Sequence, residues 1–180
     1  MADQFPRLSE KHIEFIAAQK MFFVGTAPKK GLVNVSPKGL DSLRVLNDTC
    51  IAWLNLTGSG NETAAHVLDN SRMTLMFCGF EKQPLILRVY GTADVIHPRD
   101  AAWSEFQPMF PGYVGARQVF KLQIELVLTS CGFGVPYYEF SGERPTLTLL
   151  AEKKGEAGIK DYWKEKNQLS LDQLATGIFD

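Results

Sequence analysis

Long apolar runs are absent from this 180-residue sequence, and cysteine is scarce. No apolar stretch approaches the roughly 20 residues that a membrane-spanning helix needs. The three cysteines, Cys50, Cys78 and Cys131, are an odd number and lie too far apart to match the spacing of a metal site. Cys50 and Cys78 lie in apolar runs, and we interpret them as reduced thiols of the core. The N-terminal residues lack the basic and then apolar layout of a signal peptide, so a cytoplasmic location is expected.

The sequence also lacks an excess of charge of either sign. Its 19 Lys and Arg residues nearly balance its 20 Asp and Glu residues, which leaves a net charge of −1. This balance argues against a nucleic acid or a membrane surface as the main partner. The apolar fraction of 45% is ordinary for a globular protein, and the length predicts a single domain covering residues 1–180.

Catalytic motifs are missing as well. His12, His66 and His97 are scattered, none has zinc-site spacing, and no serine lies in a nucleophile-elbow motif. We interpret each histidine as a single surface or core residue. No metal site is predicted, and the catalytic residues stay unknown. If the protein is an enzyme, we expect a cofactor to supply the chemistry.

The apolar pattern predicts an α+β fold that is mainly β. Short turns join most of the apolar runs, so neighbouring strands are expected to be antiparallel. Six or seven such strands would form a closed or nearly closed barrel, with its core at about residues 21–135. Because Pro37 has no N–H group, the second strand is expected to bend or end there. The expected strands cover residues 21–26, 32–36, 42–46, 50–56, 73–80, 85–97 and 118–129.

Helices are expected outside the barrel. Ser9 is a good N-cap for a helix that ends near residue 19, and a second helix follows the glycines at 58 and 60 and ends at about residue 70. A short helix is expected at residues 101–109. The tail, residues 143–180, is expected to be helical, with a capping-box pattern at Ser170 opening its last short helix.

The turn at residues 58–63 is the feature around which the strands and helices are arranged. It joins the apolar run at residues 50–56 to the second helix, and Gly58 and Gly60 allow a sharp turn and a close approach to the backbone. Such a strand, turn and helix N-terminus can bind a phosphate group through backbone amides. The same residues also fit a capping box, in which Ser59 and Glu62 would satisfy those amides themselves. The local pattern leaves both interpretations open.

Two cations lie in apolar surroundings. Lys38 follows the strand at residues 32–36, and Arg88 interrupts the strand at residues 85–97. A buried cation needs a partner. An anion held by Lys38, Arg88 and the amides after Gly60 would provide one. Alternatively, Arg88 is an outward-facing edge residue or pairs with an acid.

Several motifs in this order carry a resemblance to a known family. They are Asn34 to Gly39, Leu54 to Ala65, Asn70 to Phe77, Arg88 to Gly91, the loop Thr129 to Pro136, and Glu165 to Asn167. Together they resemble the pyridoxamine 5′-phosphate oxidase-like FMN-binding split-barrel family. The loop and the last motif are similar to a bacterial and fungal subgroup with no settled substrate.

The resemblance implies a six-stranded antiparallel split barrel that forms a homodimer and binds one FMN in each of two clefts between the subunits. In that family the strand matching residues 34–38 lies along the flavin, the strand end matching residues 56–57 takes its edge, and the turn matching residues 59–63 takes its phosphate. The expected cofactor-binding residues are therefore Asn34, Ser36, Lys38, Leu56, Thr57, Ser59, Gly60, Asn61, Glu62, Thr63, Arg88 and Cys131.

The sequence departs from the family pattern in two places. Glu62 and Thr63 stand where the oxidases proper have an Arg-Lys pair, so we expect Glu62 to cap the helix and Lys38 or Arg88 to supply the positive charge. The C-terminal Trp-and-Arg substrate motif of the oxidases is not evident in residues 169–180, which argues against pyridoxamine phosphate as the substrate. The resulting hypothesis is an FMN-dependent oxidoreductase that acts on an unidentified small substrate. The alternative is a flavin- or haem-binding module that stores or senses and does not catalyse.

Overall fold

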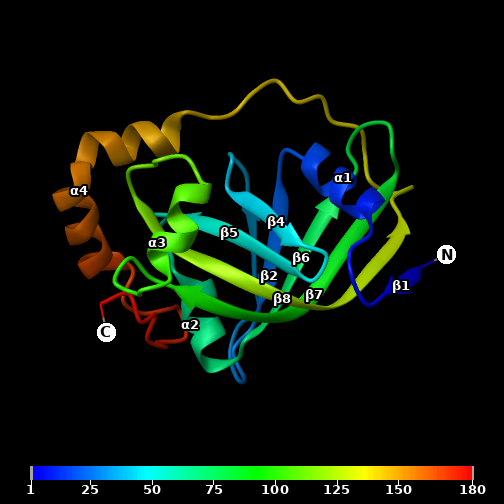
Figure 1. Ribbon diagram of the computed structural model, residues 1–180. Helices are drawn as coiled ribbons and strands as arrows, with labels where there is room; N and C mark the ends of the chain where they lie inside the picture. The colour runs from blue at the N-terminus through cyan, green and yellow to red at the C-terminus, as the bar shows by residue number, and fades with distance from the viewer. Residues whose placement is uncertain (1, 180) are drawn as a thin grey trace.

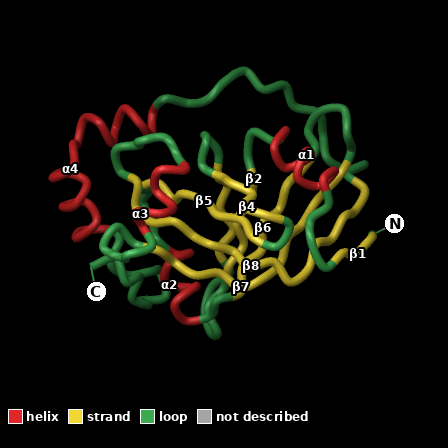
Figure 2. Tube along the Cα trace, in the orientation of Figure 1, coloured by secondary structure: helices red, strands yellow, loops and turns green. Residues whose placement is uncertain are grey.

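The computed structural model describes residues 2–179, and strands form its centre. Figure 2 shows the strands in the middle of the molecule and the helices around them. No helix within residues 2–179 combines the length and the apolar character needed to cross a membrane. The elements in chain order are β1 (Asp3–Phe5), α1 (Glu10–Ala18), β2 (Phe22–Thr26), β3 (Asn34–Lys38), β4 (Leu43–Asn47), β5 (Cys50–Leu56), α2 (Glu62–Asp69), β6 (Arg72–Cys78), β7 (Leu85–Ile96), α3 (Trp103–Phe106), the 3-10 turn η1 (Gln107–Met109), β8 (Ala116–Cys131) and α4 (Thr146–Lys166).

One antiparallel sheet contains all of the strands. Its order is β3-β2-β6-β7-β8-β5-β4, and β1 adds to β8 beside this path. Within the described residues the hydrogen-bonded ladder ends at β3 and at β4, so the sheet is a barrel that stays open between these two edges. The expected antiparallel α+β fold is confirmed, but the number of strands is eight and not six. The extra β1 is only three residues long, too short to show an alternating pattern.

The apolar run that forms β5 is buried on both of its faces. Ile51 and Trp53 lie in the main core inside the barrel, where the Trp53 ring stacks on Phe120 with centroids 4.6 Å apart. Ala52 and Leu54 point the other way, into a second cluster beneath α3. This double burial explains why the run is apolar without alternation.

Two local expectations are wrong. β3 continues through Pro37 to Lys38, and this is possible because β3 is an edge strand, where a missing N–H group costs no ladder bond. Ser170 opens no helix. Its hydroxyl accepts from the N–H of Leu174 in a turn that is closed by a bridge between Leu169 and Ala175. The tail is therefore helical only in α4.

A long extended segment, residues 132–145, connects the end of β8 to α4. Figure 1 shows it running over the sheet from one side of the molecule to the other. Almost all of its side chains are exposed. It is anchored by the N–H of Tyr138, which donates to the carbonyl of Phe80 at 3.0 Å, and by contact between the two rings.

Candidate functional site

A polar cleft of about 640 Å³ lies where β5 ends and α2 begins. Strand β3 forms one wall, the turn at residues 58–61 forms another, and the tail after α4 closes the third side. Of the twelve residues that the sequence analysis assigned to a cofactor site, nine line this cleft: Asn34, Ser36, Lys38, Leu56, Ser59, Gly60, Asn61, Glu62 and Thr63.

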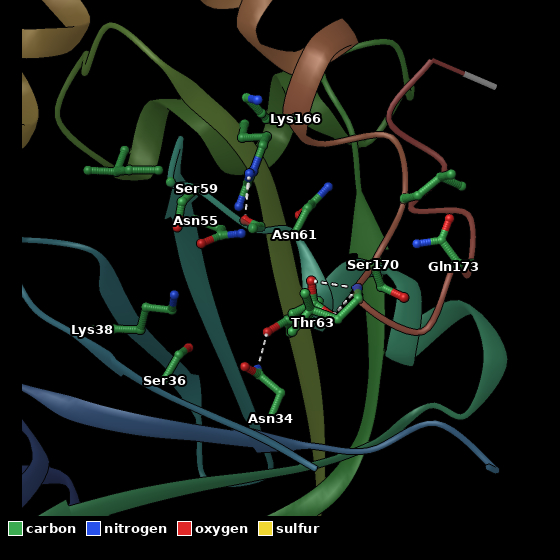
Figure 3. A pocket seen from close by; sticks show the side chains of 17 residues that line it. Asn34, Ser36, Lys38, Asn55, Ser59, Asn61, Thr63, Lys166, Ser170 and Gln173 are labelled. Atoms are coloured by element: carbon green, nitrogen blue, oxygen red, sulfur yellow. Dashed lines mark hydrogen bonds between the residues drawn. The ribbon is translucent and has the colours of Figure 1, made fainter. Parts of the chain in front are cut away.

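Alternation along β3 brings its polar side chains to the cleft. Asn34, Ser36 and Lys38 are half-buried and share one face of the strand, while the residues between them are exposed. Figure 3 shows these three side chains pointing from the strand into the cleft. The Asn34 amide donates to the hydroxyl of Thr63 at 3.3 Å and so connects β3 to the first turn of α2.

Lys38 is a cation without an acidic partner. None of the ion pairs found among residues 2–179 includes it. Burial, and to a smaller extent the nearby charge of Arg117, lowers the pKa of Lys38 to about 8. Each of these causes opposes the charged form, so an anion in the cleft would remove an existing electrostatic cost.

Arg117 is the second cation of the cleft, and the sequence analysis missed it. Its side chain is 2% exposed, and burial lowers its pKa to about 9. One guanidinium nitrogen donates to the carbonyl of Gly60 at 3.0 Å and to Oδ1 of Asn167 at 2.7 Å, while the buried Nε has no partner within the described chain. The expected strand began at residue 118, so Arg117 fell outside it. The available signal was a lone arginine directly before an apolar strand.

The glycine turn does not form the expected capping box. The N-cap of α2 is Asn61, which makes no side-chain cap bond, and Ser59 is exposed. The carboxylate of Glu62 accepts the N–H of Leu171 at 3.0 Å, so Glu62 binds the tail and does not cap the helix. The N–H groups of the first turn, at Glu62 and Thr63, have no intrahelical partner and lie at the cleft.

Three predicted residues have other surroundings. The Thr57 hydroxyl donates to the carbonyl of Gly115 and accepts from the indole of Trp163, so its bonds are already used inside the protein. Arg88 donates to the hydroxyl of Ser130 at 3.1 Å. Cys131 is exposed at the end of β8.

Strand register explains why Arg88 does not join the Lys38 cleft within one chain. Arg88 pairs with Leu128 on β8, whereas the end of β5 pairs with Ala116. Along a strand the separation between these two points of β8 is roughly 40 Å at about 3.3 Å per residue. The expected triad of Lys38, Arg88 and the amides after Gly60 is therefore not formed in a single chain, where Arg117 lies beside Lys38 instead.

Two further cavities extend the cleft along the outer segment at residues 132–145. The first has a volume of about 510 Å³ and shares Lys38 and Leu56 with the polar cleft. The second has a volume of about 780 Å³ and shares Met21 and Phe140 with the first. Apolar and aromatic side chains line most of both cavities. The three cavities thus adjoin one another, and the one at the glycine turn contains both Lys38 and Arg117.

The tail contributes cleft residues that local patterns did not suggest. Lys166, Leu169, Leu171 and Gln173 line the cleft from the side opposite β3. No group of three or more His, Cys, Asp or Glu side chains within residues 2–179 is arranged to hold a metal ion.

Comparison with known proteins gives a consistent result. The family model for pyridoxamine 5′-phosphate oxidase matches residues 8–131. The chain is 36% identical, over 197 aligned residues, to the pyridoxamine 5′-phosphate oxidase family protein ustO of Aspergillus flavus, and the match covers 94% of this chain and 76% of the relative.

Solved structures share the fold at lower identity. HupZ of Group A Streptococcus matches with 22% identity and a TM-score of 0.52, over 66% of this chain and 91% of HupZ. A candidate pyridoxamine 5′-phosphate oxidase of Lactobacillus delbrueckii matches with 23% identity and a TM-score of 0.54, over 68% of this chain and 94% of that protein. These two structures share the overall fold of this chain.

Proposed function

Since this chain belongs to the pyridoxamine 5′-phosphate oxidase family, we propose that it binds FMN in the polar cleft and is an FMN-dependent oxidoreductase. The observation that carries this proposal is the pair of the half-buried Lys38 and the buried Arg117, two cations with no acid paired to them within the described residues. A phosphate monoester carries a charge of about −1.5 to −2 at neutral pH, which matches this pair.

The residues of the cleft match a phosphate in hydrogen bonding as well as in charge. The guanidinium of Arg117, the ammonium of Lys38 and the amides of the first turn of α2 are all donors, and a phosphate offers mainly acceptors. Glu62, the acid among the described residues that line the cleft, accepts the N–H of Leu171 and pairs with none of these donors.

The apolar cavity next to the cleft suits the flavin ring. Leu56 lines both spaces, and Met21 and Leu40 line the further one, so an amphipathic ligand would have its phosphate and its ring system in matching surroundings. A bound flavin would supply hydride transfer at N5. The chain itself would bind the phosphate, orient the ring and exclude water from its apolar side.

Substrate binding is proposed for the third cavity, beneath Tyr138 and Phe140. Its lining is mainly aromatic and apolar, and its charged residues include both signs. It therefore favours an apolar or aromatic substrate and not a second phosphate ester such as pyridoxamine phosphate. The haem-binding alternative has less support, because the described residues that line the three cavities include neither histidine nor cysteine, and the tyrosine among them, Tyr138, is largely exposed.

A homodimer belongs to the same proposal. Leu32, Val33 and Val35 are between 60% and 74% exposed on and beside the open edge strand β3. Exposed apolar patches of this kind mark surfaces that another protein covers. Light scattering at micromolar concentration should give twice the monomer mass of 20.1 kDa. A monomer mass would contradict this part of the proposal.

The absorbance spectrum of the purified protein tests cofactor binding directly. Expression in a flavin-replete host should give noncovalent FMN, or added FMN should stabilise the apoprotein by about 2.7 kcal/mol at a hundred times its dissociation constant. Absence of both effects would overturn the flavin assignment. Photoreduction followed by rapid mixing with NAD(P)H and with oxygen tests turnover. A flavin that cannot be cycled would indicate a binding module.

A further inference from the structure

Asn167 lies at the junction of the tail, the glycine turn and Arg117. It is the C-cap residue of α4, and its side chain is fully buried. Its Oδ1 accepts from Arg117 at 2.7 Å, and its Nδ2 donates to the carbonyls of Gly58 at 3.2 Å and Ser59 at 3.4 Å. One side chain thus contacts both the cation and the turn of the candidate phosphate site.

The backbone of Asn167 is fixed to the protein as firmly as its side chain. Its carbonyl accepts from the hydroxyl of Thr176 at 2.6 Å and from the amide of Asn61 at 3.4 Å. Its N–H donates to the carbonyl of Trp163. These contacts hold the amide in one place beside Arg117.

The chemistry of the partners also fixes which way the amide points. A guanidinium can only donate, so the atom facing Arg117 has to be the amide oxygen. Backbone carbonyls can only accept, so the atom facing Gly58 and Ser59 has to be the amide nitrogen. Asparagine and glutamine hold an acceptor oxygen and an NH2 donor on one planar amide, and asparagine has the shorter side chain.

The charge of the acceptor matters more than its shape. Both groups that accept from Arg117, the Gly60 carbonyl and the Asn167 amide, are neutral. An aspartate at the same place would form a buried ion pair and cancel the charge of Arg117. A neutral acceptor holds the guanidinium in position and leaves its charge available to a ligand.

We propose that Asn167 is a positioning residue of the phosphate site, holding Arg117 and the turn at residues 58–60 in place while leaving the charge of Arg117 free for a phosphate. The inference rests on the proposed function and assigns a role to the tail motif at residues 165–167. It predicts that Asn167 contributes to the binding of phosphate-bearing ligands and little to the binding of the flavin ring.

The test compares FMN, riboflavin and inorganic phosphate as ligands of three proteins. The apo forms of wild type, Asn167→Asp and Asn167→Ala are titrated with each ligand, and thermal unfolding is followed in parallel. For Asn167→Asp we expect the affinity for FMN to fall by about tenfold or more, since the charge-assisted bond between Arg117 and the phosphate is lost. The affinity for riboflavin should change much less. Stabilisation by inorganic phosphate should also be smaller in Asn167→Asp than in wild type.

Asn167→Ala separates the effect of charge from the effect of packing. It removes the contacts but adds no carboxylate, so its preference for FMN over riboflavin should lie between those of wild type and Asn167→Asp. If Asn167→Asp does not fold, a lower preference in Asn167→Ala than in wild type still supports the inference, and an unchanged preference overturns it. The control is Asn47→Asp, which adds the same charge at an exposed turn and should change the affinity for neither FMN nor riboflavin.

The outcomes distinguish the inference from the proposed function. If wild type binds neither FMN nor phosphate, the proposed phosphate site fails and the inference fails with it. If wild type binds FMN and both variants keep the wild-type preference over riboflavin, the inference alone is wrong. Equal losses for FMN and riboflavin would show that Asn167 is only a structural residue.

Discussion

The ammonium nitrogen of Lys38 lies 5.6 Å from the centre of the Trp53 ring, on the inner side of the barrel. Trp53 is fully buried, and its ring also stacks on Phe120. A cation over an aromatic face is attracted by about 0.5–2 kcal/mol, less than a partner of opposite charge would provide. The contact therefore places Lys38 at the cleft without neutralising it.

Replacing Lys38 by alanine should lower the affinity for FMN about ten- to a hundred-fold, because one charge-assisted contact contributes about 1.5–3 kcal/mol. Riboflavin, which has no phosphate, should bind wild type and variant about equally. The free energy of unfolding of the apoprotein should change little or increase, since a cation without an acidic partner is removed. Isothermal titration and chemical denaturation give these quantities. Unchanged FMN affinity together with a less stable apoprotein would show that Lys38 is structural.

Apoprotein stability should depend on pH through Lys38. Its pKa is about 8 in the folded state against an ordinary value of 10.5. Between these values the unfolded chain binds the proton and the folded chain does not, so stability should increase as the pH rises through this range. Denaturation from pH 7 to 10 should show a larger increase in wild type than in Lys38→Met, which keeps only the contribution that Arg117, with its lowered pKa of about 9, adds at the upper end of the range. The exposed Lys30→Met is the control.

FMN affinity should show the opposite trend above pH 8. Binding of a phosphate favours the protonated ammonium, which wild type loses in that range, at most about tenfold in affinity per pH unit for one proton. Titration of wild type and Lys38→Met with FMN from pH 7 to 10 measures this decrease. An equal decrease in both proteins would assign it to another group.

The glycine turn gives a prediction about stability. Because Ser59 is exposed and caps nothing, Ser59→Ala should change the free energy of unfolding by less than about 0.5 kcal/mol. Asn61→Ala should cost about 1–3 kcal/mol, because the buried Asn61 accepts from Gln118 at 2.8 Å and donates to the carbonyl of Asn167. Urea denaturation of the two variants measures both changes in the free energy of unfolding. A cost above about 1 kcal/mol for Ser59→Ala would restore its role as a cap.

A larger side chain at the end of α1 should fill the proposed substrate cavity. Ala18 lines this cavity, so Ala18→Phe should abolish binding of a neutral aromatic probe such as N-phenyl-1-naphthylamine and leave FMN affinity unchanged. Ala17→Phe is the matched control, because Ala17 is also exposed on α1 but lies outside this cavity. Probe fluorescence measures the difference. Equal binding by the two variants would place the probe elsewhere.

Several features could be derived from the sequence because they depend on local order alone. The two-residue period of the strand places Asn34 and Ser36 on one face, whatever lies beside that face, whereas Lys38 joins them only because β3 continues through Pro37. The glycines after β5 predicted the strand-to-helix turn, and short connections predicted antiparallel neighbours. The family motifs are also read in order along the chain, and the family comparisons confirm that identification.

Only the tertiary structure decided which distant residues complete the cleft. The pairing of β5 with β8 brings Arg117 to the glycine turn and leaves Arg88 far along the same sheet. Docking of the tail brings Asn167 to a turn that lies more than 100 residues earlier in the chain. Strand register and the docking of a tail depend on contacts summed over the whole fold. No short stretch of sequence contains them, so Arg117 and Asn167 could be assigned only once the chain was folded.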